Sequence, residues 1–160
     1  MRYCIPAILA ILAITFAACG GGGKPNSSGN KAGGGTKATE RATVPADFKI
    51  GAKPDGFDPK AAATLEAGEA AFKATCVTCH GDAGKGDGPT GAALNPKPTD
   101  LTSAEVWADP KFTDEYMFWR IKTGNVGYTG EGTSGMTGFM GGTDEQIWQI
   151  VAYVKKLAGK

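Results

Sequence analysis

The stretch that decides the fold is Cys76-Val77-Thr78-Cys79-His80, which contains two of the four cysteines and the only histidine of the 160-residue chain. The pattern C-x-x-C-H is the attachment signature of c-type haem. Two residues between the cysteines place both sulfurs along one edge of a porphyrin, where each can add to a vinyl group. The imidazole of His80 then lies under the iron. The motif predicts one covalent haem c on Cys76 and Cys79, with His80 as an axial ligand.

Other chemistries of paired cysteines fit this chain less well. A thioredoxin-like site expects a βαβ pattern around the cysteines, and the sequence shows none. A structural zinc site needs a fourth ligand, and the remaining cysteines, Cys4 and Cys19, stand near the N-terminus. A plain disulfide between Cys76 and Cys79 stays open as an alternative in an exported protein.

The sixth position of the iron cannot take a second histidine from the same chain, so it holds methionine, another group or nothing. Methionine opposite histidine raises the reduction potential and suits electron transfer. We expect Met1 to belong to an N-terminal signal and Met117 to pack in the core from a predicted helix. Met136 and Met140 lie in a Gly-rich loop before the last predicted helix and are the candidates.

From about residue 59 to residue 157 the chain resembles the class I c-type cytochromes, which are small single-haem electron carriers. The elements that carry the resemblance are Gly68-Glu69-Ala70-Ala71-Phe72 before the C-x-x-C-H motif, Gly84-Lys85-Gly86-Asp87-Gly88, Asn95-Pro96-Lys97-Pro98-Thr99-Asp100-Leu101, Gly135-Met136-Thr137-Gly138-Phe139 and the final helix around Ile147-Trp148. The resemblance implies an all-α domain of three or more helices packed around one haem c, with long Gly-rich loops.

The resemblance also implies the axial ligands and their support. The family's methionine usually occurs as Met-Pro-x-Phe, and Met136 with Phe139 matches that register, although Thr137 replaces the proline. We therefore expect Met136 as the sixth ligand, with Met140 as its rival. The second ring nitrogen of the histidine normally donates to a proline carbonyl in the loop after the motif. Here that would be the carbonyl of Pro96 or Pro98.

Three helices are predicted from caps and apolar spacing. The first starts at Asp58-Pro59 and runs to about Thr75, the second spans about 113–123, and the third begins at Thr143-Asp144. Gly68 should let the first and third helices approach closely, with Tyr153 or Trp148 beside Phe72. The remaining large aromatic residues are expected in the core or the wall of the haem pocket: Trp107, Trp119 and Tyr128.

The N-terminal part of the chain predicts export and anchoring. Residues 1–18 contain an apolar run too short to span a bilayer, which is typical of a signal peptide. Cys19 follows Phe16-Ala17-Ala18, which resembles a bacterial lipobox and implies a lipidated cysteine. We expect a flexible Gly-rich tether over 19–44 and a cytochrome c domain over 45–160. The protein should then lie on the periplasmic side of a bacterial membrane.

Composition limits the function further. A net charge of +1 offers no basic face for nucleic acid. The scattered carboxylates form no general-base arrangement, so we expect no catalytic residues and no small-molecule substrate. The predicted function is one-electron transfer to redox partner proteins. Two alternatives are a haem enzyme or gas- or peroxide-binding protein with a displaceable sixth ligand, and a lipid-tethered binding module with a structural disulfide.

Overall fold

The computed structural model describes residues 41–125 and 135–160, all of which belong to the second of two compact units, 32–160. The predicted signal peptide, Cys19, most of the predicted tether and Tyr128 lie outside the described residues. The elements in chain order are α1 (Ala62–Thr75), α2 (Val77–His80), η2 (Gly91–Ala93), α3 (Ala104–Trp107), α4 (Asp114–Thr123) and α5 (Asp144–Leu157). Within the described ranges the only β pairing is one isolated bridge, so the predicted all-α class is confirmed.

The helix starts follow from their capping residues. Thr113 accepts a hydrogen bond from the Tyr116 amide at the start of α4. Thr143 and Gln146 form a reciprocal capping box at the start of α5. The predicted start of the first helix was too early, because Asp58 accepts the Lys60 amide in a turn and α1 begins only at Ala62.

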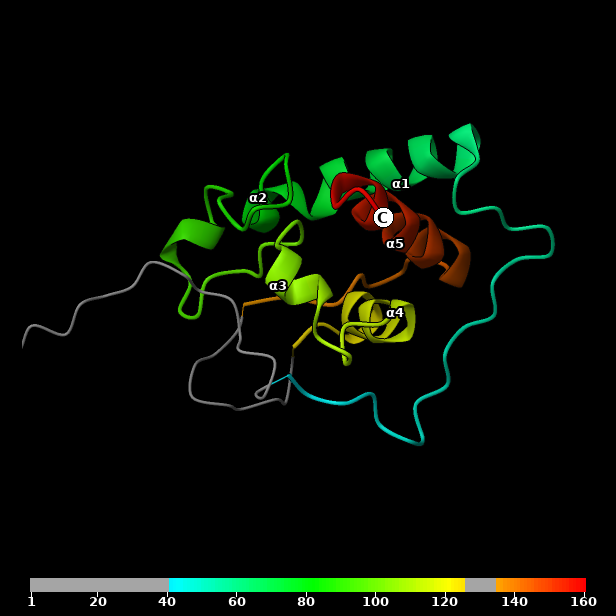
Figure 1. Ribbon diagram of the computed structural model, residues 1–160, viewed down its shortest axis with the longest axis horizontal. Coiled ribbons are helices and arrows are strands. Elements are labelled where there is room, and N and C mark those ends of the chain that lie inside the picture. The colour runs from blue at the N-terminus through cyan, green and yellow to red at the C-terminus, as the bar shows by residue number, and fades with distance from the viewer. Residues whose placement is uncertain (1–40, 126–134) are drawn as a thin grey trace, which may run out of the picture. The chain divides into compact units, whose positions relative to one another are not determined.

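The centre of the fold is the crossing of α1 and α5, with α4 packed on the other side of α5 (Figure 1). Gly68 of α1 permits this crossing, since a Cβ atom there would lie 2.1 Å from the carbonyl oxygen of Gln149. One turn further on, the rings of Phe72 and Tyr153 pack with centroids 5.4 Å apart. The predicted close approach of these helices at Gly68, with Tyr153 beside Phe72, is therefore confirmed. Trp148 packs instead against Phe118, at 4.8 Å.

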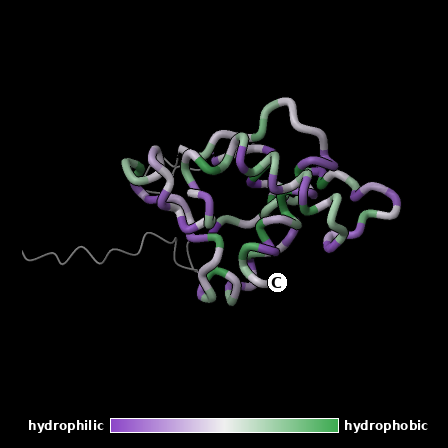
Figure 2. The backbone as a smooth tube through the Cα atoms, turned by 90° about the horizontal axis from the view of Figure 1, so that it is seen from above, coloured by the Kyte–Doolittle hydropathy of each residue, from purple (hydrophilic) through white to green (hydrophobic). Residues whose placement is uncertain are grey.

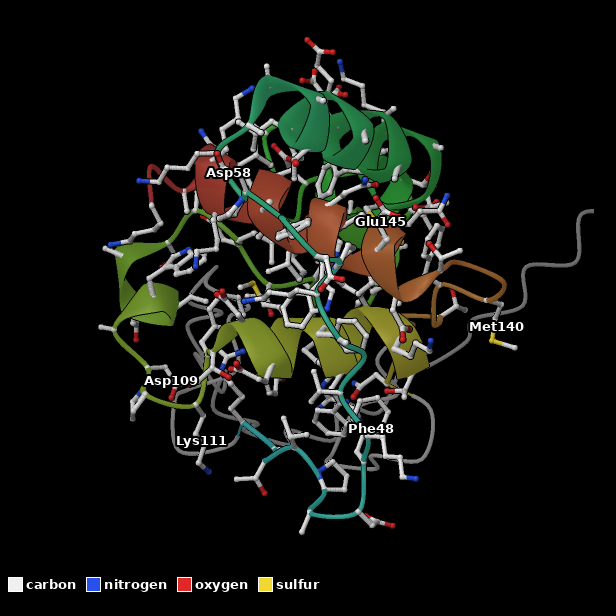
Figure 3. The ribbon with its side chains drawn as sticks, turned by 90° about the vertical axis from the view of Figure 1, so that its right-hand side faces the viewer. Phe48, Asp58, Asp109, Lys111, Met140 and Glu145 are labelled. Atoms are coloured by element: carbon white, nitrogen blue, oxygen red, sulfur yellow. The ribbon has the colours of Figure 1, made fainter. Side chains whose placement is uncertain are left out.

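Residues 41–58, which we call the strap, run across α4 and α5 before α1 begins (Figure 3). The rings of Phe48 and Trp119 form a T-shaped pair with centroids 6.4 Å apart. The indole of Trp148 donates a hydrogen bond of 2.8 Å to the carbonyl of Gly51. Hydrophilic residues interrupt the hydrophobic ones throughout the described chain (Figure 2), and none of the described helices has the length and apolar character needed to cross a bilayer.

The strap begins with a buried ion pair. Arg41 is 5% exposed and donates from Nε to the carboxylate of Asp109, which is equally buried. The guanidinium also lies over the rings of Phe112 and Tyr116, and Lys111 donates to the Arg41 carbonyl. Ala42 and Val44 also pack against the hydrophobic core. These residues, which fall at the end of the predicted tether of 19–44, therefore contact the folded domain.

Candidate functional site

The predicted attachment motif forms the joint between α1 and α2. Cys76 ends α1, and its amide still donates to the Phe72 carbonyl at 2.8 Å. The amide of His80 donates to the Cys76 carbonyl at 2.8 Å, which closes the next turn. Cys79 therefore stands on the same turn as His80. Neither Cys76 nor Cys79 is in a disulfide, so both thiols are free.

The thiol of Cys76 is kept protonated by its surroundings. Burial raises the pKa of this thiol, and a 3.4 Å contact with the Thr75 hydroxyl opposes the shift only in part. Within residues 41–125 and 135–160, no three His, Cys, Asp or Glu side chains converge as a set that could hold a metal ion directly. The two thiols and the imidazole thus form no zinc-type cluster. Their spacing is set by the helical turn from Cys76 to His80.

The loop after His80 folds back onto the motif. Gly86 donates from its amide to the His80 carbonyl at 2.8 Å, and Thr90 donates to the Thr78 carbonyl at 2.9 Å. Further along, the amide of Leu101 donates to the Gly84 carbonyl at 2.7 Å. The first two bonds satisfy carbonyl groups that would otherwise be left unpaired at the end of α2. The third bond holds the segment that ends at Leu101 against the loop that follows the histidine.

The ring of His80 is oriented by one backbone carbonyl from this loop. Nδ1 of His80 lies 3.3 Å from the carbonyl oxygen of Thr99. With the proton on Nδ1, the ring donates to Thr99 and the lone pair of Nε2 remains for a metal. Burial lowers the pKa of the imidazole, with the Thr99 hydrogen bond acting in the opposite direction, so the neutral, metal-binding form is favoured.

The predicted acceptor, Pro96 or Pro98, is corrected to Thr99. The carbonyl of Pro98 faces Gly86 instead, since a Cβ atom on Gly86 would lie 2.3 Å from that oxygen. The next carbonyl along the chain is therefore the one that reaches the imidazole. The loop was predicted correctly from the resemblance, whereas the register within it depends on packing against Gly86.

The methionine loop, 135–140, is docked on the C-terminal end of α4. The backbone N–H of Asn125 donates to the Met136 carbonyl at 2.8 Å, and the backbone N–H of Phe139 donates to the Ile121 carbonyl at 2.7 Å. Between these bonds, Gly124 and Thr137 form the isolated antiparallel bridge. The loop also reaches the segment after η2, because a Cβ atom on Gly135 would lie 2.9 Å from the side chain of Leu94.

The three described methionines occupy different environments. Met117 is 4% exposed in the core, as predicted for a packing residue. Met140 is 89% exposed, and its side chain projects away from the helices (Figure 3). Met136 is half-buried in the docked loop. Of the two candidates for the sixth ligand, only Met136 has a side chain that is partly enclosed by the fold.

Trp107 and Trp119 make their contacts within the protein. Trp107 donates from Nε1 to the Leu101 carbonyl at 2.7 Å, and Trp119 is 2% exposed in the core. Both were predicted as core or pocket wall, and both pack in or against the hydrophobic core, with Trp107 only partly buried. The sequence interpretation missed Arg120 and Asn125, which meet beside the methionine loop. The only available signal was their position at the end of a predicted helix.

A family model described as cytochrome c matches residues 65–158, which is more than half of the chain. The chain belongs to the cytochrome c family. The predicted resemblance to class I c-type cytochromes is thereby confirmed. This cytochrome c matches no curated protein.

The solved structures that are similar to this cytochrome c in fold include a chain from the reducing HAO-like protein complex of Kuenenia stuttgartiensis, with 24% sequence identity and a TM-score of 0.53. The match covers 76% of this cytochrome c and 54% of the solved chain, so this cytochrome c spans about half the length of its structural relative. At this level of identity the likeness establishes the fold alone.

The residues of this cytochrome c fit a covalent haem c. Two free thiols on successive turns would form the thioether bonds, and the oriented imidazole of His80 would bind the iron from one side. The haem supplies one-electron exchange at iron when bound. The protein's own contribution is to fix His80 through Thr99 and to present the docked methionine loop.

Proposed function

We propose that this cytochrome c is a single-electron carrier with one haem c, attached through Cys76 and Cys79 and bound axially by His80 and Met136. The observation that carries the proposal is the pair of restrained ligand segments. His80 is held by the carbonyl of Thr99, and the backbone of Met136 is held by Asn125. Two fixed ligands that persist in both oxidation states require little reorganisation when an electron moves.

Whether a methionine fills the sixth position of the iron distinguishes an electron carrier from a protein that binds small ligands. An iron with both axial positions filled by protein resists small ligands, whereas an open or displaceable position binds them. Met136 is half-buried and Met140 is exposed, so removing each side chain should affect ligand binding at the iron differently.

The test compares Met136→Ala with Met140→Ala in the haem-loaded protein. Met136→Ala should abolish the sulfur-to-iron absorption band, lower the reduction potential and allow carbon monoxide to bind the reduced protein quickly. Met140→Ala should leave all three properties unchanged. Rapid, stoichiometric carbon monoxide binding by the unaltered protein would favour a gas- or peroxide-binding role and contradict the proposal.

We propose further that the protein is exported and anchored through a lipid on Cys19, with the Gly-rich segment before Arg41 as the tether. The apolar run of residues 5–18 and the small residues before Cys19 support this proposal. About 20 tether residues give a typical reach of about 25 Å. Cys19→Ser should move the holoprotein from the membrane fraction to the soluble fraction. An unchanged distribution would contradict the anchor.

Redox partner proteins follow from the proposed activity, since a carrier must exchange electrons with a donor and an acceptor. Cross-linking of the membrane-bound holoprotein in the oxidised and reduced states, followed by mass spectrometry, would identify them. Faster haem reduction in the presence of a captured partner would distinguish a redox partner from an incidental neighbour.

A further inference from the structure

Arg120 lies on α4 close to the base of the methionine loop, and its guanidinium is held on the helix side by two aromatic residues. Nε donates to the hydroxyl of Tyr116 at 3.0 Å. The guanidinium carbon lies 4.4 Å from the centroid of the Trp119 ring. A planar guanidinium restrained in this way presents its remaining donors in a fixed direction.

Those donors reach the residues that follow α4. Nη1 of Arg120 donates to the side-chain oxygen of Asn125 at 2.5 Å and lies 3.3 Å from the Gly124 carbonyl. Hydrogen bonds from a charged donor are shorter and stronger than neutral ones. The positive charge also lies at the C-terminal end of a helix, where the backbone carbonyls favour a cation. Arg120 therefore fixes both the backbone and the side chain of the residues that leave α4.

Asn125 passes this restraint to the methionine loop, since its backbone N–H donates to the Met136 carbonyl at 2.8 Å. The contact is tight, and glycine is required in it. Gly124 has a φ of +69°, and a Cβ atom there would lie 2.5 Å from the Met136 carbonyl oxygen and 2.4 Å from the Gly138 amide nitrogen. The backbone of Met136 is thus set by residues 124 and 125, and these are set by Arg120.

We propose that Arg120 is a positioning residue for the sixth iron ligand, acting through Asn125. The inference rests on the proposed ligation by Met136. In this role Arg120 acts on the backbone that carries the ligand. It reduces the freedom of the backbone from which the Met136 side chain extends, and so favours the ligand-bound arrangement over one in which the sulfur has left the iron.

The experiment uses the haem-loaded protein and compares Arg120→Gln, Asn125→Ala and Asn125→Asp. The first two remove the charged donor or its acceptor, whereas Asn125→Asp keeps an oxygen acceptor for Arg120. Lys122→Gln is the matched control, because Lys122 lies on the same helix and pairs with Asp144 through an exposed side chain. The measurements are the sulfur-to-iron band, the reduction potential and the rate of carbon monoxide binding to the reduced protein.

Arg120→Gln and Asn125→Ala should weaken the band, lower the potential and speed carbon monoxide binding about tenfold or more, the effect of losing one hydrogen bond to a charged group. Lys122→Gln should behave as the unaltered protein, and Asn125→Asp should keep the band and the slow binding of carbon monoxide. If Arg120→Gln does not fold, the measurements on Asn125→Ala test the inference. Unchanged properties in Asn125→Ala overturn the inference, provided that Met136→Ala abolishes the band. A band that survives in Met136→Ala refutes the ligand assignment itself.

Discussion

The two sides of the candidate haem site are built in different ways. On one side, His80 stands one residue after Cys79, and its position follows from the turn of α2 and the loop that folds back on it. On the other side, Met136 belongs to a loop that is held by the far end of a different helix, through Ile121 and Asn125. The histidine side is therefore local in sequence, and the methionine side depends on tertiary docking. Changes to each side should have distinguishable effects.

The largest expected effect comes from removing the local attachment. Cys76→Ser with Cys79→Ser leaves no thiol in the motif, so the purified protein should carry no covalent haem and its mass should equal that of the bare polypeptide. Denaturing electrophoresis with haem staining provides the measurement. Retention of haem under those conditions would mean that attachment lies elsewhere in the chain.

A change remote from both ligand sides tests whether the docking depends on overall stability. Asp109→Asn leaves the buried Arg41 without a carboxylate partner and should lower the free energy of unfolding at neutral pH by about 3 kcal/mol. Urea unfolding measures this loss. The sulfur-to-iron band should remain until the cooperative transition begins. Loss of the band well before unfolding would show that the strap and the methionine loop are coupled.

The same ion pair predicts a pH dependence. Burial alone would raise the pKa of Asp109, but the hydrogen bond and charge of Arg41, with Lys111, bring it below its ordinary value of 3.8. The stabilisation is therefore fully present above that value and is lost as the pH falls through the lower, folded pKa. The stability difference between the unaltered protein and Asp109→Asn should be constant from pH 7 to about 5. It should shrink under strongly acidic conditions, and a loss above pH 5 would contradict the assignment.

A change at the crossing of α1 and α5, which supports the histidine side, should lower stability by a smaller amount. Gly68→Ala places a methyl group against the Gln149 carbonyl and forces α1 and α5 apart, at a cost of about 2 kcal/mol. Thermal unfolding of the holoprotein provides the measurement, and the exposed Glu66→Ala on the same helix serves as the control. Because α1 leads directly into Cys76, the haem should stay attached while stability falls. A neutral result would show that the crossing can relax.

The smallest effect is expected at the start of α5, next to the methionine loop. Thr143→Ala removes one half of the capping box and should cost about 1 kcal/mol of stability. The reduction potential should stay near that of the unaltered protein, because Met136 is anchored on α4. A marked drop in potential would instead place the anchor of the loop on α5.

Local features of this chain were predictable, and distant pairings were not. The attachment motif, the caps at Thr113 and Thr143 and the small residue at Gly68 each follow from rules that need only a few neighbouring residues. The carbonyl that orients His80 was predicted at Pro96 or Pro98 and lies at Thr99, one residue after the second of these, because the carbonyl of Pro98 faces Gly86.

Contacts between residues far apart in the chain account for what the sequence interpretation missed. Arg41 pairs with Asp109 across 68 positions, and no local pattern marks either residue as a partner. Asn125 and Met136 belong to different segments, so their hydrogen bond appears only once α4 and the loop have packed together. The sequence showed Arg120 only as a charged residue on a predicted helix. Its proposed role could be inferred only once the structure placed Asn125 within hydrogen-bonding distance.

The strap has a practical consequence for anyone who expresses this protein in shortened form. A gene trimmed to the matched residues 65–158 would start inside α1 and omit residues 41–58 altogether. The indole of Trp148 would lose its acceptor at Gly51, Trp119 would lose the cover of Phe48, and Asp109 would lose its counterion. Such a fragment should precipitate or bind hydrophobic dyes, whereas one that begins at Arg41 or earlier keeps those aromatic rings out of water.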